Sequence, residues 1–293
     1  MSAASDPLAG SRMSLGEHLD ELRSRLLKGL AAVAIAFAVA WGFRERVAVF
    51  VLSPYRQAMD LLETQLQDEA DRILAANPAR KRTEFYVTAD PEDRRLSRFD
   101  KRAITTKPGE SFFFNLKVAL YASVFVGSPV LLWQLWRFVS AGLYRHERRA
   151  LTRFFPVSLG LFVLGVFFGF RWMVPWAMYF LNQDVSIELV IPDIKLEDFL
   201  TFLSSLCLAL GVVFQLPVLM AFLGLAGIVE PSTMARYRGH FVVGAFVLAA
   251  ILTPPDPFTQ ILLGLPMVVL YEVGIWSARI LARRERRSVE GAA

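Results

Sequence analysis

The sequence predicts an all-α protein that crosses a membrane six times. Of its 293 residues, 55% are hydrophobic and 13% are aromatic, which exceeds the roughly 45–50% apolar content of soluble domains. The apolar residues gather in runs that reach the length of about 20 residues that a helix needs to cross a bilayer. Hydrocarbon offers no hydrogen bonds to irregular backbone, so we expect these runs to be helices.

Polar segments separate the six runs. The predicted spans are 27–50, 112–136, 154–181, 198–225, 240–253 and 258–278. The last two are expected to be short, because three prolines in Thr253–Pro257 end the fifth and Pro266 interrupts the sixth. Short spans would thin a hydrocarbon core of ~30 Å. Ordinary variation in span length explains the same pattern and is kept as the alternative.

The distribution of basic residues predicts that both termini are cytoplasmic. Four Lys or Arg residues lie in segment 1–28, five in 137–153, two in 229–239 and five in 279–293. The short connections on the other side are poor in basic residues, with only Lys195 in 182–197. Segment 51–111 carries many Arg and Lys, but loops of that length are exported with little regard to charge. Short cytoplasmic loops carry the excess of positive charge, so this asymmetry sets the orientation.

The chain divides into a cytoplasmic head (1–28), a six-helix membrane domain (29–278) and a basic cytoplasmic tail (279–293). The head is predicted to be an amphipathic helix that runs into the first span, because leucines recur every three or four residues from Leu15 to Leu26. A long extracytoplasmic insertion, 56–111, lies within the membrane domain. Its first part, 56–77, is predicted to be a charged helix, and we find no chemistry in the rest.

Three polar side chains within the spans are candidate functional groups, because such groups are costly in a membrane. Gln215 lies in the middle of the fourth span, before Pro217. It either forms a hydrogen bond between helices, worth about 1 kcal/mol, or contacts a partner helix or a substrate. Glu272 is expected to pair with Arg279 or to reach the interface.

Lys117, near the outer end of the second span, is the third of these side chains. It is expected to pair with Glu110 or Asp256, or to extend to the headgroups.

Glu147 is the only acid in segment 137–153, among five arginines. It could be neutralised by Arg145 or Arg148, and Glu21 in the head could pair with Arg25 four residues later. Such pairs contribute ~0–1 kcal/mol at a wet surface. The alternative is that these carboxylates receive a cation from another molecule.

The motifs of several enzyme classes are absent from the sequence, so no catalytic activity is expected. We find no phosphate-binding G-x-x-x-x-G-K-[ST] loop, no G-x-S-x-G turn and no H-E-x-x-H zinc helix. The single cysteine, Cys207, and three widely spaced histidines predict neither a disulfide framework nor a metal site. No cofactor is expected.

Several motifs occur in the same order as in one family, and the chain resembles TatC, the multispanning receptor subunit of the twin-arginine protein translocase. The motifs are His18–Leu27, Ser53 and Pro54, Phe112 and Phe113 with Lys117, Gln134–Val139, Gly142–Arg149, Phe214–Pro217, Leu252–Pro257 with Gln260, and Pro266 with Met267. The resemblance covers nearly the whole chain except about 57–105 and the last residues.

The resemblance implies a binding site for the Arg-Arg pair of export signals on the cytoplasmic face. Its acids correspond to Glu21 and Glu147, with Arg23 and Arg149 beside them, and His18 and Leu22 belong to the same head motif. A guanidinium group can bind a carboxylate through two parallel hydrogen bonds, whereas lysine is a point charge. Burial of the signal's apolar stretch must supply the remaining affinity.

The resemblance also implies a concave helix arrangement on which single-span subunits of the TatA and TatB type dock. Positions implied for this docking are Gln215, Glu272 and Phe246, with the last two spans as the surface. Outer-side motif positions, where a structural role is as well supported as a functional one, are Pro54, Phe113, Lys117, Asp256 and Gln260. TatC proteins commonly carry Glu where this chain has Gln215, which cannot titrate.

The resemblance therefore implies a core receptor subunit for folded precursor proteins, in an oligomeric complex of the plasma membrane that uses the proton gradient. No nucleic acid is expected among its partners. A secondary transporter for a small cation, with Gln215 and Glu272 along its path, is the alternative. The chain shows no internal repeat of the kind that many such transporters have.

Overall fold

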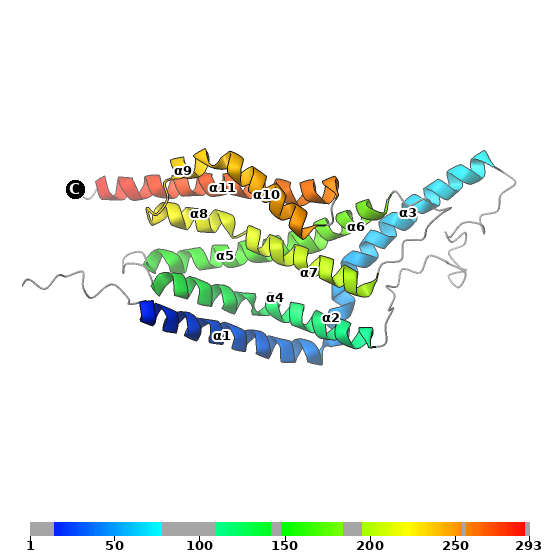
Figure 1. Cartoon of the computed structure of the whole chain (residues 1–293), viewed down its shortest axis with the longest axis horizontal. Coiled ribbons are helices and arrows are strands. Elements are labelled where there is room, and N and C mark those ends of the chain that lie inside the picture. Colours follow the sequence, from blue (N-terminus) through cyan, green and yellow to red (C-terminus); the bar gives the residue numbers. More distant parts are fainter. Residues whose placement is uncertain (1–14, 78–108, 142–147, 184–194, 254–255, 291–293) are drawn as a thin grey trace, which may run out of the picture.

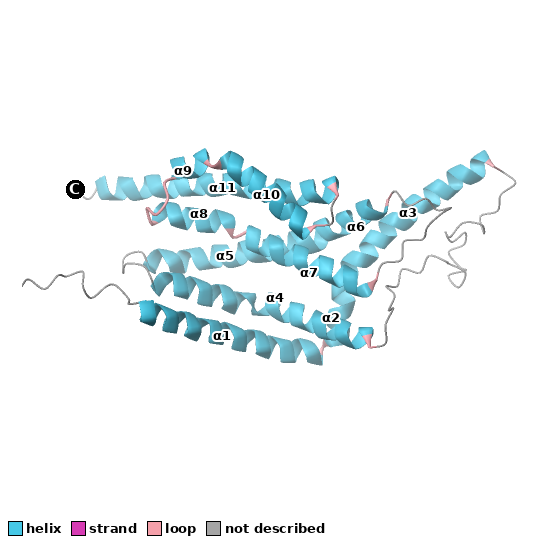
Figure 2. Cartoon of the chain, viewed as in Figure 1, coloured by secondary structure: helices cyan, strands magenta, loops and turns pink. Residues whose placement is uncertain are grey.

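The computed structural model describes residues 15–77, 109–141, 148–183, 195–253 and 256–290. Helices make up nearly all of this part, as Figure 2 shows, which confirms the all-α prediction. The elements are α1 (Leu15–Gly42), α2 (Arg44–Val51), α3 (Ser53–Ala76), α4 (Glu110–Ala141), α5 (Arg148–Phe168), the π-helix η2 (Gly169–Met173), α6 (Val174–Asn182), α7 (Leu196–Val213), α8 (Leu216–Leu225), α9 (Pro231–Arg236), α10 (Arg238–Leu252) and α11 (Pro257–Glu290).

The long helices lie roughly parallel to one axis and alternate in direction (Figure 1). α1 packs along α4, α5 packs on α7, and α11 packs on α8. α1 begins, and α4 and α11 end, at the same end of the molecule (Figure 1), which we call the arginine-rich end because Arg23, Arg25, Arg137, Arg279 and Arg283 belong to these segments. The other end is called the opposite end.

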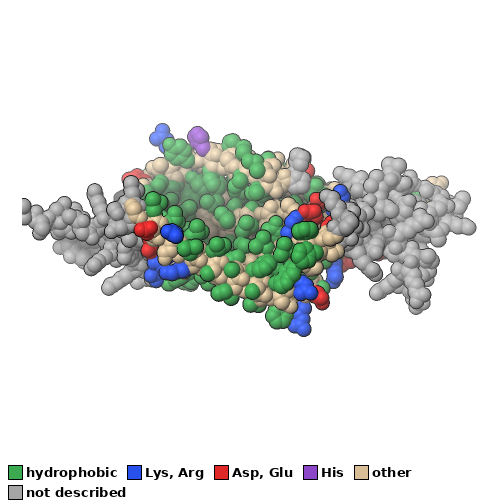
Figure 3. Space-filling view, turned by 60° about the horizontal axis from the view of Figure 1, so that its bottom comes forward, with side chains coloured by type: hydrophobic (Ala, Val, Ile, Leu, Met, Phe, Trp, Pro, Cys, Tyr) green, Lys and Arg blue, Asp and Glu red, His purple; other side chains and the backbone are tan. Residues whose placement is uncertain are grey.

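Five helical segments are long and apolar enough to cross a membrane. They are Leu19–Gly42, Glu110–Val139, Phe154–Asn182, Leu196–Leu225 and Pro257–Arg283. The fifth predicted span corresponds to α10, which is apolar but has only 15 residues, as expected. Hydrophobic side chains cover the middle of the face in Figure 3, and charged ones gather toward the two ends, as in a protein that crosses a bilayer.

The expectation that the sixth span is short is wrong. α11 has 34 residues and continues through Pro266 into the tail. Ala, Leu, Arg and Glu dominate the tail and all favour helix. Proline removes one backbone hydrogen bond but does not end a helix whose neighbours hold it in place.

Two other predicted spans are interrupted next to a proline. Pro217 cannot donate a hydrogen bond to Val213, the last residue of α7, and the fourth span divides there into α7 and α8. Pro175 likewise cannot donate to Arg171, which lies in η2 between α5 and α6. The first span is also divided, by a turn at Phe43 between α1 and α2.

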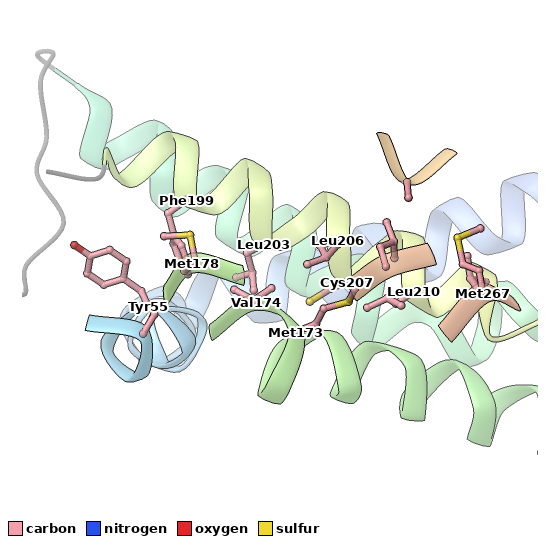
Figure 4. Close-up of a cluster of buried hydrophobic side chains, with 14 of the residues drawn as sticks. Tyr55, Met173, Val174, Met178, Phe199, Leu203, Leu206, Cys207, Leu210 and Met267 are labelled. Carbon is pink, nitrogen blue, oxygen red and sulfur yellow. The ribbon is translucent and has the colours of Figure 1, made fainter. Parts of the chain in front are cut away.

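The start of the insertion packs against the membrane domain. The predicted helix 56–77 is present as α3, and α3 packs on α6 and buries Tyr55, Ala58, Met59 and Leu62. These residues belong to the main hydrophobic cluster, which continues through α7 (Figure 4). The start of the insertion therefore has a structural role, and its later segments lie outside the described residues.

The core is concentrated on one span. In the segment Leu196–Leu225, 61% of the most apolar 18-residue stretch is buried, whereas the corresponding share in Leu19–Gly42 is 11%. Close backbone approach contributes to this burial, since a Cβ added at Gly165 of α5 would lie 2.7 Å from the Leu210 carbonyl oxygen. α7 is thus the centre of the bundle, and α1 is a peripheral helix with most of its apolar side chains exposed.

Candidate functional site

Glu21 on α1 is the site acid that the structure describes at the arginine-rich end. Arg25, one turn later, donates from Nε and Nη2 to Glu21 Oε1, at 2.8 and 2.5 Å. The side chains of Glu21 and Arg25 are 26% and 17% exposed. The i,i+4 pair that the sequence allowed is therefore present, and both nitrogens use the same carboxylate oxygen.

The same guanidinium connects α1 to α4. Arg25 Nη1 donates to Gln134 Oε1 at the longer distance of 3.4 Å. Among the described residues, no further hydrogen bond or ion pair engages Glu21, and its Oε2 has no partner there. The cluster of Glu21, Arg25 and Gln134 is called the Glu21 cluster below.

The other residues that the sequence assigned to this site are only partly described. Leu22 and Arg23 are exposed on α1, and no described residue forms an ion pair or hydrogen bond with Arg23. Glu147 and the side chains of His18 and Arg149 lie outside the described residues. The resemblance implied Arg23 beside the carboxylate. The described base on Glu21 is Arg25, the i,i+4 partner that the sequence offered as the alternative.

Gln215 lies between α7 and α8 and bonds to α5. Ser158 Oγ donates to Gln215 Oε1 at 2.5 Å, and Gln215 Nε2 donates to the Ser158 carbonyl oxygen at 3.0 Å. Trp136 Nε1 of α4 donates to the same hydroxyl at 2.9 Å. Of the two alternatives, the interhelical hydrogen bond is the one present. These three residues are called the Gln215 cluster.

The predicted partner of Glu272 is wrong. Its carboxylate binds Arg238 of α10 through two hydrogen-bonding contacts, at 2.6 and 2.8 Å, rather than Arg279. Arg279 lies two turns further along the same helix, whereas Arg238 lies at the start of the helix that packs beside it. The pair is half-exposed and connects α10 to α11.

Phe246 and Gln260 take part in the same helix pair. Gln260 Nε2 donates to the Phe246 carbonyl oxygen at 3.1 Å, and the Phe246 ring lies where a Cβ on Gly264 would be. Both residues therefore contribute to the packing of α10 on α11.

The motif positions at the opposite end have mainly structural contacts. Lys117 pairs with Glu197 at the start of α7. The prediction that Lys117 pairs with Glu110 or Asp256 is therefore wrong. Asp256 instead accepts hydrogen bonds from the backbone N–H and the hydroxyl of Thr259, which caps the start of α11. No sequence pattern singled out this cap beforehand.

Pro54 and Phe113 complete the motif positions at the opposite end. Pro54 is buried in the first turn of α3. Phe113 is exposed and packs edge-on against Phe112, which in turn contacts Trp41 of α1.

An apolar cavity of about 570 Å³ opens between α2, α4, α5 and α7. One side of the cavity is lined by α4, through Val118, Ala122 and Phe125. The other sides include Phe162 of α5 and Cys207 of α7. Arg46 is the charged residue in this lining. Within the described residues, no group of three or more His, Cys, Asp or Glu side chains is arranged to hold a metal ion.

Comparisons with known proteins agree on one family. A family model described as Sec-independent protein translocase protein (TatC) matches residues 17–266. A TatC protein of Aquifex aeolicus is 31% identical over 94% of this chain and 98% of its own length. One of Halothiobacillus neapolitanus is 33% identical over 89% of the chain, which spans 61% of that longer protein.

A solved structure shares the fold. A crystal structure of the twin-arginine translocase receptor TatC superimposes with a TM-score of 0.67, at 30% identity, over 90% of this chain and 99% of the other.

Proposed function

The chain belongs to the TatC family of Sec-independent protein translocase proteins, and on that premise we propose that it is the translocase subunit that binds the Arg-Arg pair of export signals. Members of this family are components of a protein translocase and not enzymes. In this proposal the protein lies in the plasma membrane, and its arginine-rich end faces the cytoplasm. Glu21 and Glu147 bind the two arginines of the signal.

The geometry of Glu21 is the observation that carries the proposal. Its carboxylate is only 26% exposed and has one oxygen, Oε2, without a described hydrogen bond. A guanidinium forms charge-assisted bonds of ~1.5–3 kcal/mol each to such a group. A partly buried carboxylate is screened less than an exposed one, so each bond to it is stronger. The planar fork of arginine can bind both of its oxygens, whereas lysine is a point charge, so the site favours arginine.

Apolar contacts must supply the rest of the affinity, since two charge-assisted bonds do not give tight binding on their own. A signal carries an apolar stretch after its arginines, and the described chain offers apolar surface on exposed helix faces and in the cavity between α2, α4, α5 and α7. We propose that the apolar stretch packs there. α4 contributes to both places, through Gln134 of the Glu21 cluster and through the cavity lining.

Single-span subunits of the translocase are proposed to dock on α10. Val243, Val247 and Ile251 are exposed on this short helix, and a Cβ at Gly239 or Gly244 would contact nothing within 4 Å. Exposed small residues let a second helix approach closely in a membrane. An oligomeric complex driven by the proton gradient follows from this assignment and is part of the proposal.

The alternative, a transporter for a small cation, has less support. Glu272 is paired with Arg238, and the Gln215 amide is bonded through both its oxygen and its nitrogen to Ser158. Both groups would have to leave these partners before they could bind a passing cation.

Photo-crosslinking from α1 tests the proposal. A photo-reactive residue replaces Leu22, which is exposed next to Glu21, and a matched one replaces Val39, which is exposed near the other end of the same helix. A peptide with the Arg-Arg signal is expected to crosslink from position 22 through residues beside its arginines, and to do so much less when these are Lys-Lys. Equal crosslinking of the two peptides from position 22 contradicts the proposal.

A further inference from the structure

Arg25 is bonded to Glu21, the acid that we propose binds a signal arginine. Its guanidinium forms, within the chain, the kind of contact that the incoming arginine would form. We propose that Arg25 is the resident ligand of Glu21 and that a signal arginine binds by exchange with it. This inference rests on the proposed function and adds a residue that sets the affinity of the same site.

The distances favour exchange over simple addition. Both Arg25 contacts fall on Oε1, at 2.8 and 2.5 Å, so only Oε2 remains for a second cation. A guanidinium binds a carboxylate most strongly when each oxygen accepts one of two parallel hydrogen bonds. An incoming arginine can reach that arrangement only when Arg25 leaves Oε1.

Gln134 offers the displaced guanidinium a second acceptor. Arg25 Nη1 already lies 3.4 Å from Gln134 Oε1, which is a long and therefore weak hydrogen bond in the resting state. After exchange this bond can shorten without a large movement of α1. Glu21 then has one ion pair before and after the exchange. Arg25 keeps a hydrogen bond to the neutral amide of Gln134 and does not have to move toward the other arginines of this end.

The resident contact is weak enough to be displaced. Partly exposed i,i+4 pairs contribute ~0–1 kcal/mol, so Arg25 occupies Glu21 for about half to four-fifths of the time. A signal arginine can bind only the fraction of molecules in which Arg25 has left Glu21. The apparent affinity is therefore lowered to that free fraction, about one half to one fifth of its intrinsic value. A lysine is a point charge that can bind the remaining Oε2 without displacing Arg25. Arg25 therefore lowers the affinity for the Arg-Arg signal more than the affinity for a Lys-Lys signal.

Equilibrium binding of a labelled twin-arginine signal peptide to the full chain in lipid nanodiscs tests this. Arg25→Gln is expected to bind the Arg-Arg peptide about two- to fivefold more tightly than the unchanged protein. Arg25→Lys, which keeps the charge but not the fork, is expected to lie between them. Lys28→Gln is the matched control, because Lys28 is exposed on the same helix and its loss removes the same positive charge.

The direction of the change separates the possible outcomes. Tighter binding of the Arg-Arg peptide with Arg25→Gln, beyond any change with Lys28→Gln and beyond the gain for the Lys-Lys peptide, supports exchange. Weaker or equal binding, in a variant whose thermal unfolding matches the unchanged protein, overturns it and indicates that Arg25 orients Glu21. Loss of affinity through misfolding cannot imitate the expected gain. If Glu21→Gln leaves binding unaffected, the proposed function fails first.

Discussion

The Glu21 cluster and the Gln215 cluster each join helices through a polar side chain, but they differ in what satisfies it. Gln215 is bonded to a backbone carbonyl and to a fully buried hydroxyl that also accepts from Trp136. Glu21 is bonded to a long side chain of its own helix, and its Oε2 has no hydrogen-bond partner among the described residues. Fixed partners make a polar group structural, whereas an exchangeable partner leaves it able to bind another molecule.

The largest expected effect concerns the stability of the Gln215 cluster. Ser158→Ala removes the acceptor of Trp136 Nε1 and one partner of the Gln215 amide. Each unsatisfied buried group costs about 1–3 kcal/mol, so we expect about 3 kcal/mol less free energy of unfolding in micelles. Signal affinity per folded molecule should not change. A change in affinity without a change in stability would assign this cluster to binding.

A smaller effect is expected from packing beside the same cluster. Gly165→Ala places a Cβ 2.7 Å from the Leu210 carbonyl oxygen and 2.8 Å from the Phe214 ring, next to Gln215. Because backbone cannot easily move away, overpacking should cost about 1–3 kcal/mol. Gly160→Ala on the same helix has open space and is expected to leave stability equal or slightly higher. Equal unfolding temperatures for the two variants would show that α5 and α7 are not rigidly packed there.

The next prediction concerns the apolar part of the binding surface. Ala122→Trp fills the cavity between α2, α4, α5 and α7, whereas Leu120→Trp adds the same side chain to an exposed position outside it. If the signal's apolar stretch occupies the cavity, only the first change should lower affinity, by about fivefold for ~1 kcal/mol of lost burial. Titration of labelled signal peptide measures both. An equal loss in the two variants places the apolar stretch elsewhere.

The smallest expected effect comes from the ion pair at the opposite end. Lys117 and Glu197 join α4 to α7, and both side chains are more than a third exposed. A double-mutant cycle with Lys117→Met and Glu197→Gln should give a coupling of at most about 1 kcal/mol, which falls as salt is added. A larger, salt-insensitive coupling would mean that this pair is as fixed as the Gln215 cluster.

The sequence predicted the class of fold and most of the helices, because long apolar runs in a membrane have few alternatives to helix. It did not predict where helices break. Pro217 and Pro266 look alike in sequence, yet the helix ends before the first and continues through the second. Neighbouring helices decide whether a lost backbone bond is compensated, and a single sequence does not list those neighbours.

The candidate site was predicted in part for the same reason. The i,i+4 spacing identified the Glu21–Arg25 pair, since both residues lie on one helix. The partners of Lys117 and Glu272 come from other helices and were predicted wrongly. Local spacing predicts contacts within an element, whereas contacts between elements depend on how helices are arranged around α7.

The central claim is that Glu21 binds a signal arginine, and an affinity cycle tests it most directly. Arg-Arg and Lys-Lys peptides are titrated against the unchanged protein and against Glu21→Gln in nanodiscs. The loss of one charge-assisted bond of ~1.5–3 kcal/mol predicts at least about tenfold weaker binding of the Arg-Arg peptide, with a smaller loss for Lys-Lys. Equal preference for Arg-Arg in both proteins would contradict the claim.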